Sequence, residues 1–160
     1  MSDALITVAA SFFGSLGFAV LYNTRGARIL IPAFGGAAFW GIYLLLFHFI
    51  DNEYLGFFAV AILITIYAEI WARILKTPAT TVLMPTVIPF IPGGALYYAV
   101  SAALRMDIPV FAAKARSALG LAVALAAGIM VVTSLRAPAD LLYRHLAKLI
   151  VAPGLKQRKK

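Results

Sequence analysis

Apolar residues form long runs along this chain, separated by short stretches in which charged and turn-forming residues gather. A helix needs roughly 20 mainly apolar residues to cross the hydrocarbon layer of a membrane, and five runs approach that length. They extend over Ala4 to Tyr22, Ile29 to Ile50, Tyr54 to Leu75, Val82 to Leu104 and Ser117 to Leu135. The pattern predicts an all-α integral membrane protein with about five transmembrane helices.

The composition also indicates a membrane environment. Of the 160 residues, 63% are hydrophobic and 12% are charged, which fits one membrane domain. The first run follows Met-Ser-Asp without a basic residue, so we expect a retained helix and not a signal peptide. We expect residues 1–136 to form a five-helix transmembrane domain and residues 137–160 to form an amphipathic helix and a basic tail.

The fourth run is interrupted by turn-forming residues. These are Pro85, Pro89, Pro92, Gly93 and Gly94. Each proline removes a backbone donor and biases the preceding residue away from helical geometry, so the fourth crossing is predicted to be broken. Irregular backbone at membrane depth occurs only where it is packed in protein or lines an aqueous cavity. The break is therefore the best pointer to a substrate pathway.

A short helix is expected to restart at the break. Pro92 suits its first position, and the 13 residues from Pro92 to Leu104 would span roughly 20 Å, too little to cross the membrane. The start of this half-helix would lie inside the bilayer, where unpaired N–H groups and the helix dipole favour a carboxylate. Tyr97 and Tyr98 follow within two turns and could add a hydroxyl donor. The alternative is a kinked helix shaped only for packing.

One acidic residue lies well inside a predicted crossing. Glu69 stands four residues before Arg73, so the two share a helix face in the order that favours an ion pair. An ionisable residue at membrane depth usually faces a bundle interior or an aqueous cavity, which makes Glu69 a candidate for ion coupling. The alternative is an ion pair near the interface that only positions the helix.

The basic residues predict an orientation, because Lys and Arg are retained on the cytoplasmic side. The first loop contains Arg25 and Arg28, the third contains Arg73 and Lys76, and the tail contains seven basic residues from Arg136 to Lys160. The second loop contains Asp51 and Glu53 and no basic residue. Five crossings then place the N-terminus outside and the tail in the cytoplasm.

The fourth loop departs from this rule, because Arg105, Lys114 and Arg116 would lie outside beside a single Asp107. A re-entrant fourth segment would correct that loop but export the strongly basic tail. Five crossings satisfy the rule better.

The net charge of +8 does not indicate nucleic acid, because half of the basic residues follow the last crossing, where anionic lipid is the nearer partner. From Pro138 to Val151, apolar residues recur at helical spacing with charges on the other face, which predicts an interfacial helix. The closing basic residues are expected to anchor this topology.

The residues that carry most enzyme chemistry are sparse. The chain has no cysteine, and its two histidines, His48 and His145, lie in no metal-binding pattern. No nucleophile elbow or phosphate-binding glycine loop occurs, and the six acidic residues are scattered. We expect no enzyme activity, no metal site and no cofactor.

Small residues recur every fourth position on two predicted helices. They are Ala33, Ala37 and Gly41, and Gly120, Ala124 and Gly128. Such grooves let another helix approach closely, either within this chain or from another subunit. A chain this short has little surface from which to enclose a polar path, so we expect it to associate with a partner.

Two segments together resemble a known family. The string Pro89-Phe-Ile-Pro92-Gly93-Gly-Ala-Leu-Tyr97, preceded by Arg73 and by Lys76-Thr77-Pro78, resembles the signature of the C-terminal membrane half of ThrE-type threonine/serine exporters. Residues 17–23, ending in Asn23, and the later Gly35-Gly36 are similar to the start of the same half. Length and layout match the free-standing small subunit of split members. Pro85 and the Gly-Gly pair depart from the family pattern and bear on the cargo more than on the fold.

The resemblance implies a secondary exporter in a bacterial inner membrane, assembled with a larger ThrE-type subunit that has a cytoplasmic portion and five helices of its own. Its cargo would be threonine and serine, or a dicarboxylate such as succinate, all of which carry a carboxylate. The expected pathway residues are Pro89, Pro92, Gly93, Gly94, Tyr97 and Asn23. Two bundles with an odd number of crossings can form an inverted repeat.

Two other classes stay open. The chain could be a membrane scaffold or accessory subunit whose broken helix merely packs. It could also form a passive pore as a homo-oligomer.

Overall fold

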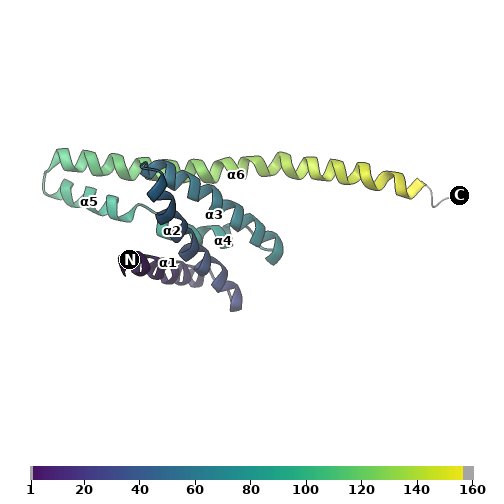
Figure 1. Ribbon diagram of the computed structural model, residues 1–160, viewed down its shortest axis with the longest axis horizontal. Helices are drawn as coiled ribbons and strands as arrows, with labels where there is room; N and C mark the ends of the chain where they lie inside the picture. The colour runs from purple at the N-terminus through teal and green to yellow at the C-terminus, as the bar shows by residue number, and fades with distance from the viewer. Residues whose placement is uncertain (1, 157–160) are drawn as a thin grey trace.

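The computed structural model describes the backbone of residues 2–156 and the side chains of residues 3–135. Within that part of the chain every regular element is helical (Figure 1). In chain order they are α1 (Ser2–Leu21), η1 (Gly26–Ile29), α2 (Leu30–Phe49), α3 (Glu53–Leu75), α4 (Thr80–Val87), η2 (Ile88–Phe90), α5 (Gly93–Leu104) and α6 (Ile108–Lys156). The predicted all-α membrane fold is confirmed.

Four helical segments are long and apolar enough to cross a membrane by themselves: Asp3–Leu21, Gly26–Phe49, Glu53–Leu75 and Ile108–Leu135. The helices Thr80–Phe90 and Gly93–Leu104 meet at a bend of 53°, and by length and composition the pair qualifies as one more span that is broken, or as a re-entrant segment. Figure 1 shows this bent pair leading from the α3–α4 loop at one end of the bundle to the α5–α6 loop at the opposite end. The predicted break in the fourth apolar run is therefore present.

The fifth crossing differs from its predicted bounds. Helix α6 begins at Ile108 and not at Ser117, so Lys114 and Arg116 lie on a helix and not in a loop. Asp107 begins the helix, because its Oδ1 accepts a hydrogen bond of 3.3 Å from the Val110 N–H. Pro109 stands in the first helical turn, where its missing N–H costs no helical hydrogen bond, so the helix can start ahead of Lys114 and Arg116.

The predictions of an interfacial helix and a basic tail at the end of the chain stay untested. Helix α6 continues to Lys156. The side chains of the predicted interfacial segment from Pro138 to Val151, and the basic residues from Arg136 to Lys160, lie outside the side chains that the structure describes.

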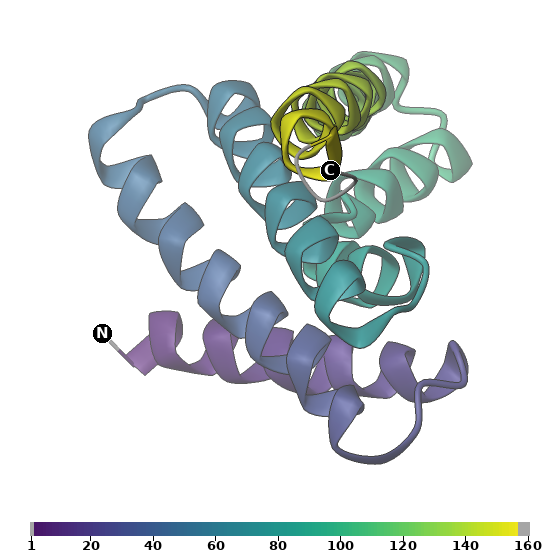
Figure 2. The same ribbon diagram turned by 90° about the vertical axis from the view of Figure 1, so that its right-hand side faces the viewer.

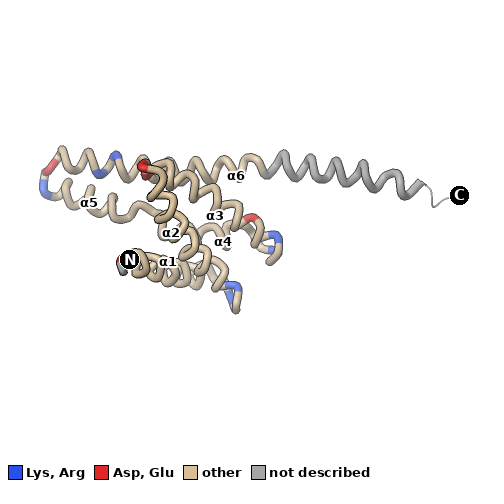
Figure 3. The backbone as a smooth tube through the Cα atoms, in the orientation of Figure 1, with Lys and Arg blue, Asp and Glu red and all other residues tan. Residues whose placement is uncertain are grey.

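Charged residues lie mainly at the two ends of the described bundle (Figure 3). Three helices end in a residue with left-handed backbone, namely Asn23, Lys76 and Met106, with φ of 56°, 53° and 57°. This conformation closes the last helical turn and reverses the chain. The band between the two charged ends is apolar, as a membrane span requires.

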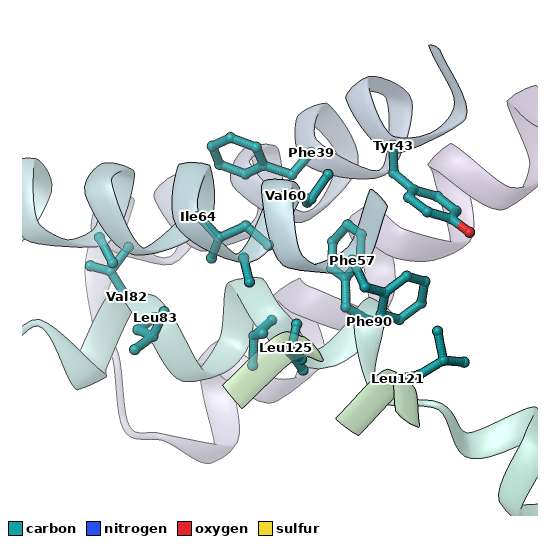
Figure 4. Close-up of a cluster of buried hydrophobic side chains, with 13 residues drawn as sticks. Phe39, Tyr43, Phe57, Val60, Ile64, Val82, Leu83, Phe90, Leu121 and Leu125 are labelled. Atoms are coloured by element: carbon teal, nitrogen blue, oxygen red, sulfur yellow. The ribbon is translucent and has the colours of Figure 1, made fainter. Parts of the chain in front are cut away.

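The core lies where α2, α3, α4 and α6 meet. Its buried members include Phe39, Tyr43, Phe57, Val60, Ile64, Val82, Leu83, Phe90, Leu121 and Leu125 (Figure 4). Helix α1 packs on α2 at the edge of the bundle away from α6, and α5 packs mainly against α6 (Figures 1 and 2). Helix α5 is thus attached to the bundle along one side.

Phe90 fixes the break in the fourth crossing to this core. Its side chain is fully buried, and its ring centroid lies 5.3 Å from Trp40, 6.1 Å from Tyr43 and 5.9 Å from Phe57. Thr86 is also fully buried and donates a 2.7 Å hydrogen bond to the Val82 carbonyl. The irregular backbone up to Phe90 is therefore sheltered by protein, as membrane depth demands.

The small residues of α6 serve packing within this chain. A Cβ atom at Gly128 would lie 2.6 Å from both the Ala61 Cβ and the Phe58 carbonyl oxygen, and one at Gly120 would lie 2.5 Å from Tyr54 Cε1. Helix α2 approaches α1 closely at Gly36, where a Cβ would lie 2.8 Å from the Ser15 Cβ, while Gly41 faces open space. The α6 groove thus receives α3.

We predict that Gly128→Val destabilises the protein by about 1–3 kcal/mol, because backbone lies in the space that the new side chain needs. The matched control is Gly17→Val, since an added Cβ there meets no atom within 4 Å. Thermal unfolding in detergent should show a lower Tm for Gly128→Val than for Gly17→Val. Equal Tm values would contradict this close helix contact.

Candidate functional site

The start of α5 leaves backbone donors unused. The first helical hydrogen bond runs from the Leu96 N–H to the Pro92 carbonyl at 3.1 Å, and the Gly93 N–H turns back to the Ile91 carbonyl at 2.6 Å. The N–H groups of Gly94 and Ala95 belong to the first turn, where a helix offers no acceptor of its own. These amides carry the positive end of the α5 dipole, which suits an anion.

The two glycines at this start are exposed, and an added Cβ at either would meet no atom within 4 Å. Close packing inside this chain therefore does not require glycine at Gly93 or Gly94, in contrast to Gly128. Because Gly93 and Gly94 have no side chains, the first-turn amides stay open to the surroundings.

A polar stripe continues from this start along α5. Tyr97, Ser101 and Arg105 follow Gly93 at intervals of four residues, so they lie on one helix face. A cavity of about 270 Å³ is lined by Tyr97, Tyr98, Ser101, Ala102, Arg105, Asp107, Val110 and Lys114. The two cations of this cavity stand beside three hydroxyl groups, which are suitable partners for a carboxylate.

Lys114 reaches this stripe from the neighbouring helix. Its Nζ lies 5.8 Å from the centroid of the Tyr98 ring, within the range of a cation–π contact. The rings of Tyr97 and Tyr98 meet edge to face at 5.5 Å. These contacts hold the outer part of the stripe together.

The other face of α5 is apolar. Together with α6 it forms a groove of about 420 Å³, to which α5 contributes Leu96, Ala99 and Val100. Helix α5 therefore separates an apolar groove from a polar stripe. We name the face of Gly93, Gly94, Tyr97, Ser101 and Arg105 the α5 polar face.

The remaining predicted pathway residues do not join the α5 polar face. Pro89 lines a separate cavity of about 260 Å³ between α1, α2 and η2, together with Ser11 and Trp40. Pro92 lines the apolar groove. Asn23 lies in the exposed α1–α2 loop, where its Oδ1 accepts a 3.1 Å hydrogen bond from Arg25 Nε.

Glu69 and Arg73 face a different region. Both line a cavity of about 310 Å³ with Val132 and Leu135 of α6. Glu69 also lines a second cavity, of about 330 Å³, with residues of α3, α4, α6 and the α3–α4 loop. The structure thus brings the predicted pair together but apart from α5.

Some candidate residues were missed in the sequence. The four-residue spacing that leads from Gly93 to Ser101 and Arg105 is visible in the sequence and could have indicated both. Lys114 could not have been found, because only the observed packing of α6 on α5 brings it to Tyr98. No group of three or more His, Cys, Asp or Glu side chains that could hold a metal ion occurs among the described residues.

The chain was compared with protein families, curated proteins and solved structures. The model of the family described as "Threonine/Serine exporter, ThrE" matches residues 7–135, a range that begins within the first candidate span and ends with the last one. No curated protein and no solved structure matches the chain.

We predict that the α5 polar face is wetted in the assembled protein and that the opposite face is not. The chain has no cysteine, so single-cysteine variants report one position each. Ser101→Cys should react with a charged, membrane-impermeant thiol reagent, whereas Val100→Cys at nearly the same depth should not. Equal labelling of the two variants would contradict the assignment of a polar face.

Proposed function

Because the chain belongs to the threonine/serine exporter family ThrE, which has an exporter-type role in membrane transport, we propose that it is the small membrane subunit of a two-component secondary transporter. Its cargo would be small carboxylate-bearing metabolites, namely threonine and serine or a dicarboxylate such as succinate. The observation that carries the proposal is the start of α5, where first-turn amides lie open beside Gly93 and Gly94. The role is that of a carrier and not of an enzyme.

The carboxylate is the group that these cargoes share, and the α5 polar face offers it successive partners. Amides at Gly94 and Ala95 would hold it first, because hydrogen bonds to the positive end of a helix stabilise an anion. The hydroxyls of Tyr97 and Ser101 follow, and Arg105 with Lys114 lies at the far end. An anion can move along such a row without losing all its partners at once.

This path also accounts for the basic residues that break the positive-inside pattern. With the N-terminus outside and the tail in the cytoplasm, Arg105 and Lys114 lie on the outer side, where such residues are disfavoured. Their positions on the polar cavity support a role in attracting a carboxylate from the pathway.

The polar face needs a cover that this chain does not supply. Tyr97 is 70% exposed and Tyr98 is 59% exposed, too open for the walls of an enclosed path. We assign the cover to a larger ThrE-type subunit, whose five helices would form an inverted repeat with these five in a bacterial inner membrane. The basic tail would contact anionic lipid.

We predict that Gly94→Asp lowers efflux roughly tenfold or more, because a fixed carboxylate at the helix start repels the cargo carboxylate and satisfies the same amides. Gly94→Asn is the matched control, since it has the same size without the charge. Efflux from cells that co-express the chain and its partner should fall more for Gly94→Asp than for Gly94→Asn. Normal efflux from an inserted Gly94→Asp variant would remove this site from the proposal.

A second prediction concerns the outer cations. Replacing Arg105 and Lys114 by Gln should raise the cargo concentration needed for half-maximal transport severalfold, because two favourable charges are lost from the pathway. The control is Arg116→Gln, which removes a neighbouring α6 charge that does not line the polar cavity. If this chain is instead a scaffold or accessory subunit that does not contact the cargo, the complex should transport equally well with all three substitutions, and that result would favour the alternative.

A further inference from the structure

The apolar groove between α5 and α6 has no part in the carboxylate path. Its volume is about 420 Å³, and all the side chains that line it are apolar. Buried Ala99 and Ala118 lie at its floor, while the larger Leu96 and Leu119 are exposed at its sides. Small side chains below and large ones on both sides make a furrow that opens to the surroundings.

The length of the groove fits an acyl chain. It follows α6 from Phe111 to Ala122, which is roughly 16 Å of helix. The hydrocarbon core of a bilayer is about 30 Å thick, so one leaflet provides roughly 15 Å of depth for a lipid tail. A transmembrane helix of another protein would pass through both leaflets and needs a groove about twice as long. The groove therefore suits the tail of one lipid better than a second helix.

The end of the groove near the α5–α6 loop is cationic (Figure 3). Lys114 and Arg116 stand on either side of Ala115, which lines the groove. Arg105 follows the last residue of α5 at the same loop. Among the described side chains from α5 onward, Asp107 is the one acidic residue. Arg116 does not line the polar cavity, so the carboxylate path leaves its charge without a role.

The depth of Arg116 matches that of a lipid phosphate. Residues 117–135 of α6 carry no charge and span roughly 28 Å, close to the thickness of the hydrocarbon core. Arg116 therefore stands at the edge of the hydrocarbon. Side chains on a helix lean toward its N-terminus, which for α6 is the direction of the α5–α6 loop. The guanidinium is thus directed toward the headgroups, and Arg pairs with phosphate through two parallel hydrogen bonds.

We propose that this groove binds one anionic glycerophospholipid, with an acyl chain between α5 and α6 and the phosphate at Arg116. Lys114 adds positive charge beside the headgroup. The groove lies on the opposite side of α5 from the α5 polar face, so a partner that covers the polar face leaves the groove to the membrane. The proposal does not depend on the cargo.

Such a lipid would hold α5 to the rest of the protein. Helix α5 packs mainly against α6, so little else in the described part of this chain keeps it in place. A lipid that lies between the two helices binds only while they are packed. Its binding therefore stabilises the folded state.

The test uses the full chain purified in detergent, with dioleoyl phosphatidylglycerol or dioleoyl phosphatidylcholine added at equal concentration. These lipids have the same acyl chains, and only the first has a net negative charge. Phosphatidylglycerol should raise the Tm of the wild type by several degrees more than phosphatidylcholine. This excess should fall to about half or less in Arg116→Gln. It should persist in Arg28→Gln, which removes the same charge from η1, in the turn between α1 and α2.

A second pair of variants tests the acyl chain. Ala122 lines the groove and is exposed, so the ring of Ala122→Phe fills the inner end of the groove without entering the core. This variant should also reduce the excess. Ala126→Phe is the matched control, because Ala126 lies one turn further along α6, is likewise exposed and does not line the groove. Should Ala122→Phe fail to fold, Val100→Phe fills the groove from α5.

Four results would overturn the proposal. Equal Tm rises with the two lipids in the wild type would show no preference for an anionic headgroup. An excess that is unchanged in both Arg116→Gln and Ala122→Phe would assign the anionic lipid to the basic tail. An excess lost only in Arg116→Gln would contradict an acyl chain in the groove. If Ala122→Phe keeps the lipid effect but no longer co-purifies with the larger ThrE-type subunit, the groove holds a partner helix instead.

Discussion

The whole arrangement depends on one constraint: in hydrocarbon, every backbone N–H and C=O group needs a partner inside the protein. Unbroken helices meet it along four of the five crossings. The fourth crossing does not, and the core compensates by burying Phe90 among the rings of Trp40, Tyr43 and Phe57. Beyond Phe90 the core no longer covers the backbone, and the first turn of α5 is exposed. The first-turn amides of α5 therefore lie where a ligand can reach them.

The same constraint supports the proposal that this chain is part of a larger assembly. Its α5 polar face, with the exposed tyrosines and Arg105, would be costly against lipid, yet the described part of this chain leaves that face uncovered. A second bundle that covers this face would turn an exposed stripe into an enclosed path.

Much of the fold could be predicted from the sequence, because length and apolarity alone define a membrane crossing. The break in the fourth apolar run could also be predicted, since prolines and paired glycines act on the backbone locally. The start of α6 was not predicted correctly, because the charges of Lys114 and Arg116 suggested a loop, whereas Asp107 caps a helix that begins ahead of them. The polar cavity beside Glu69 could not be predicted for a different reason: Thr65 shares a helix face with Glu69, but Thr80 and Thr133 meet it only through the packing of three helices.

The central claim is that this chain is half of a carrier for carboxylate-bearing metabolites. The most direct measurement is efflux of preloaded threonine, serine and succinate from cells that express this chain alone, its candidate larger partner alone, or both. Export that requires both proteins is the result that the account predicts, and the exported compound would identify the cargo. Absence of export with both proteins shown to be inserted would contradict the account and leave a scaffold whose proline–glycine break serves packing alone.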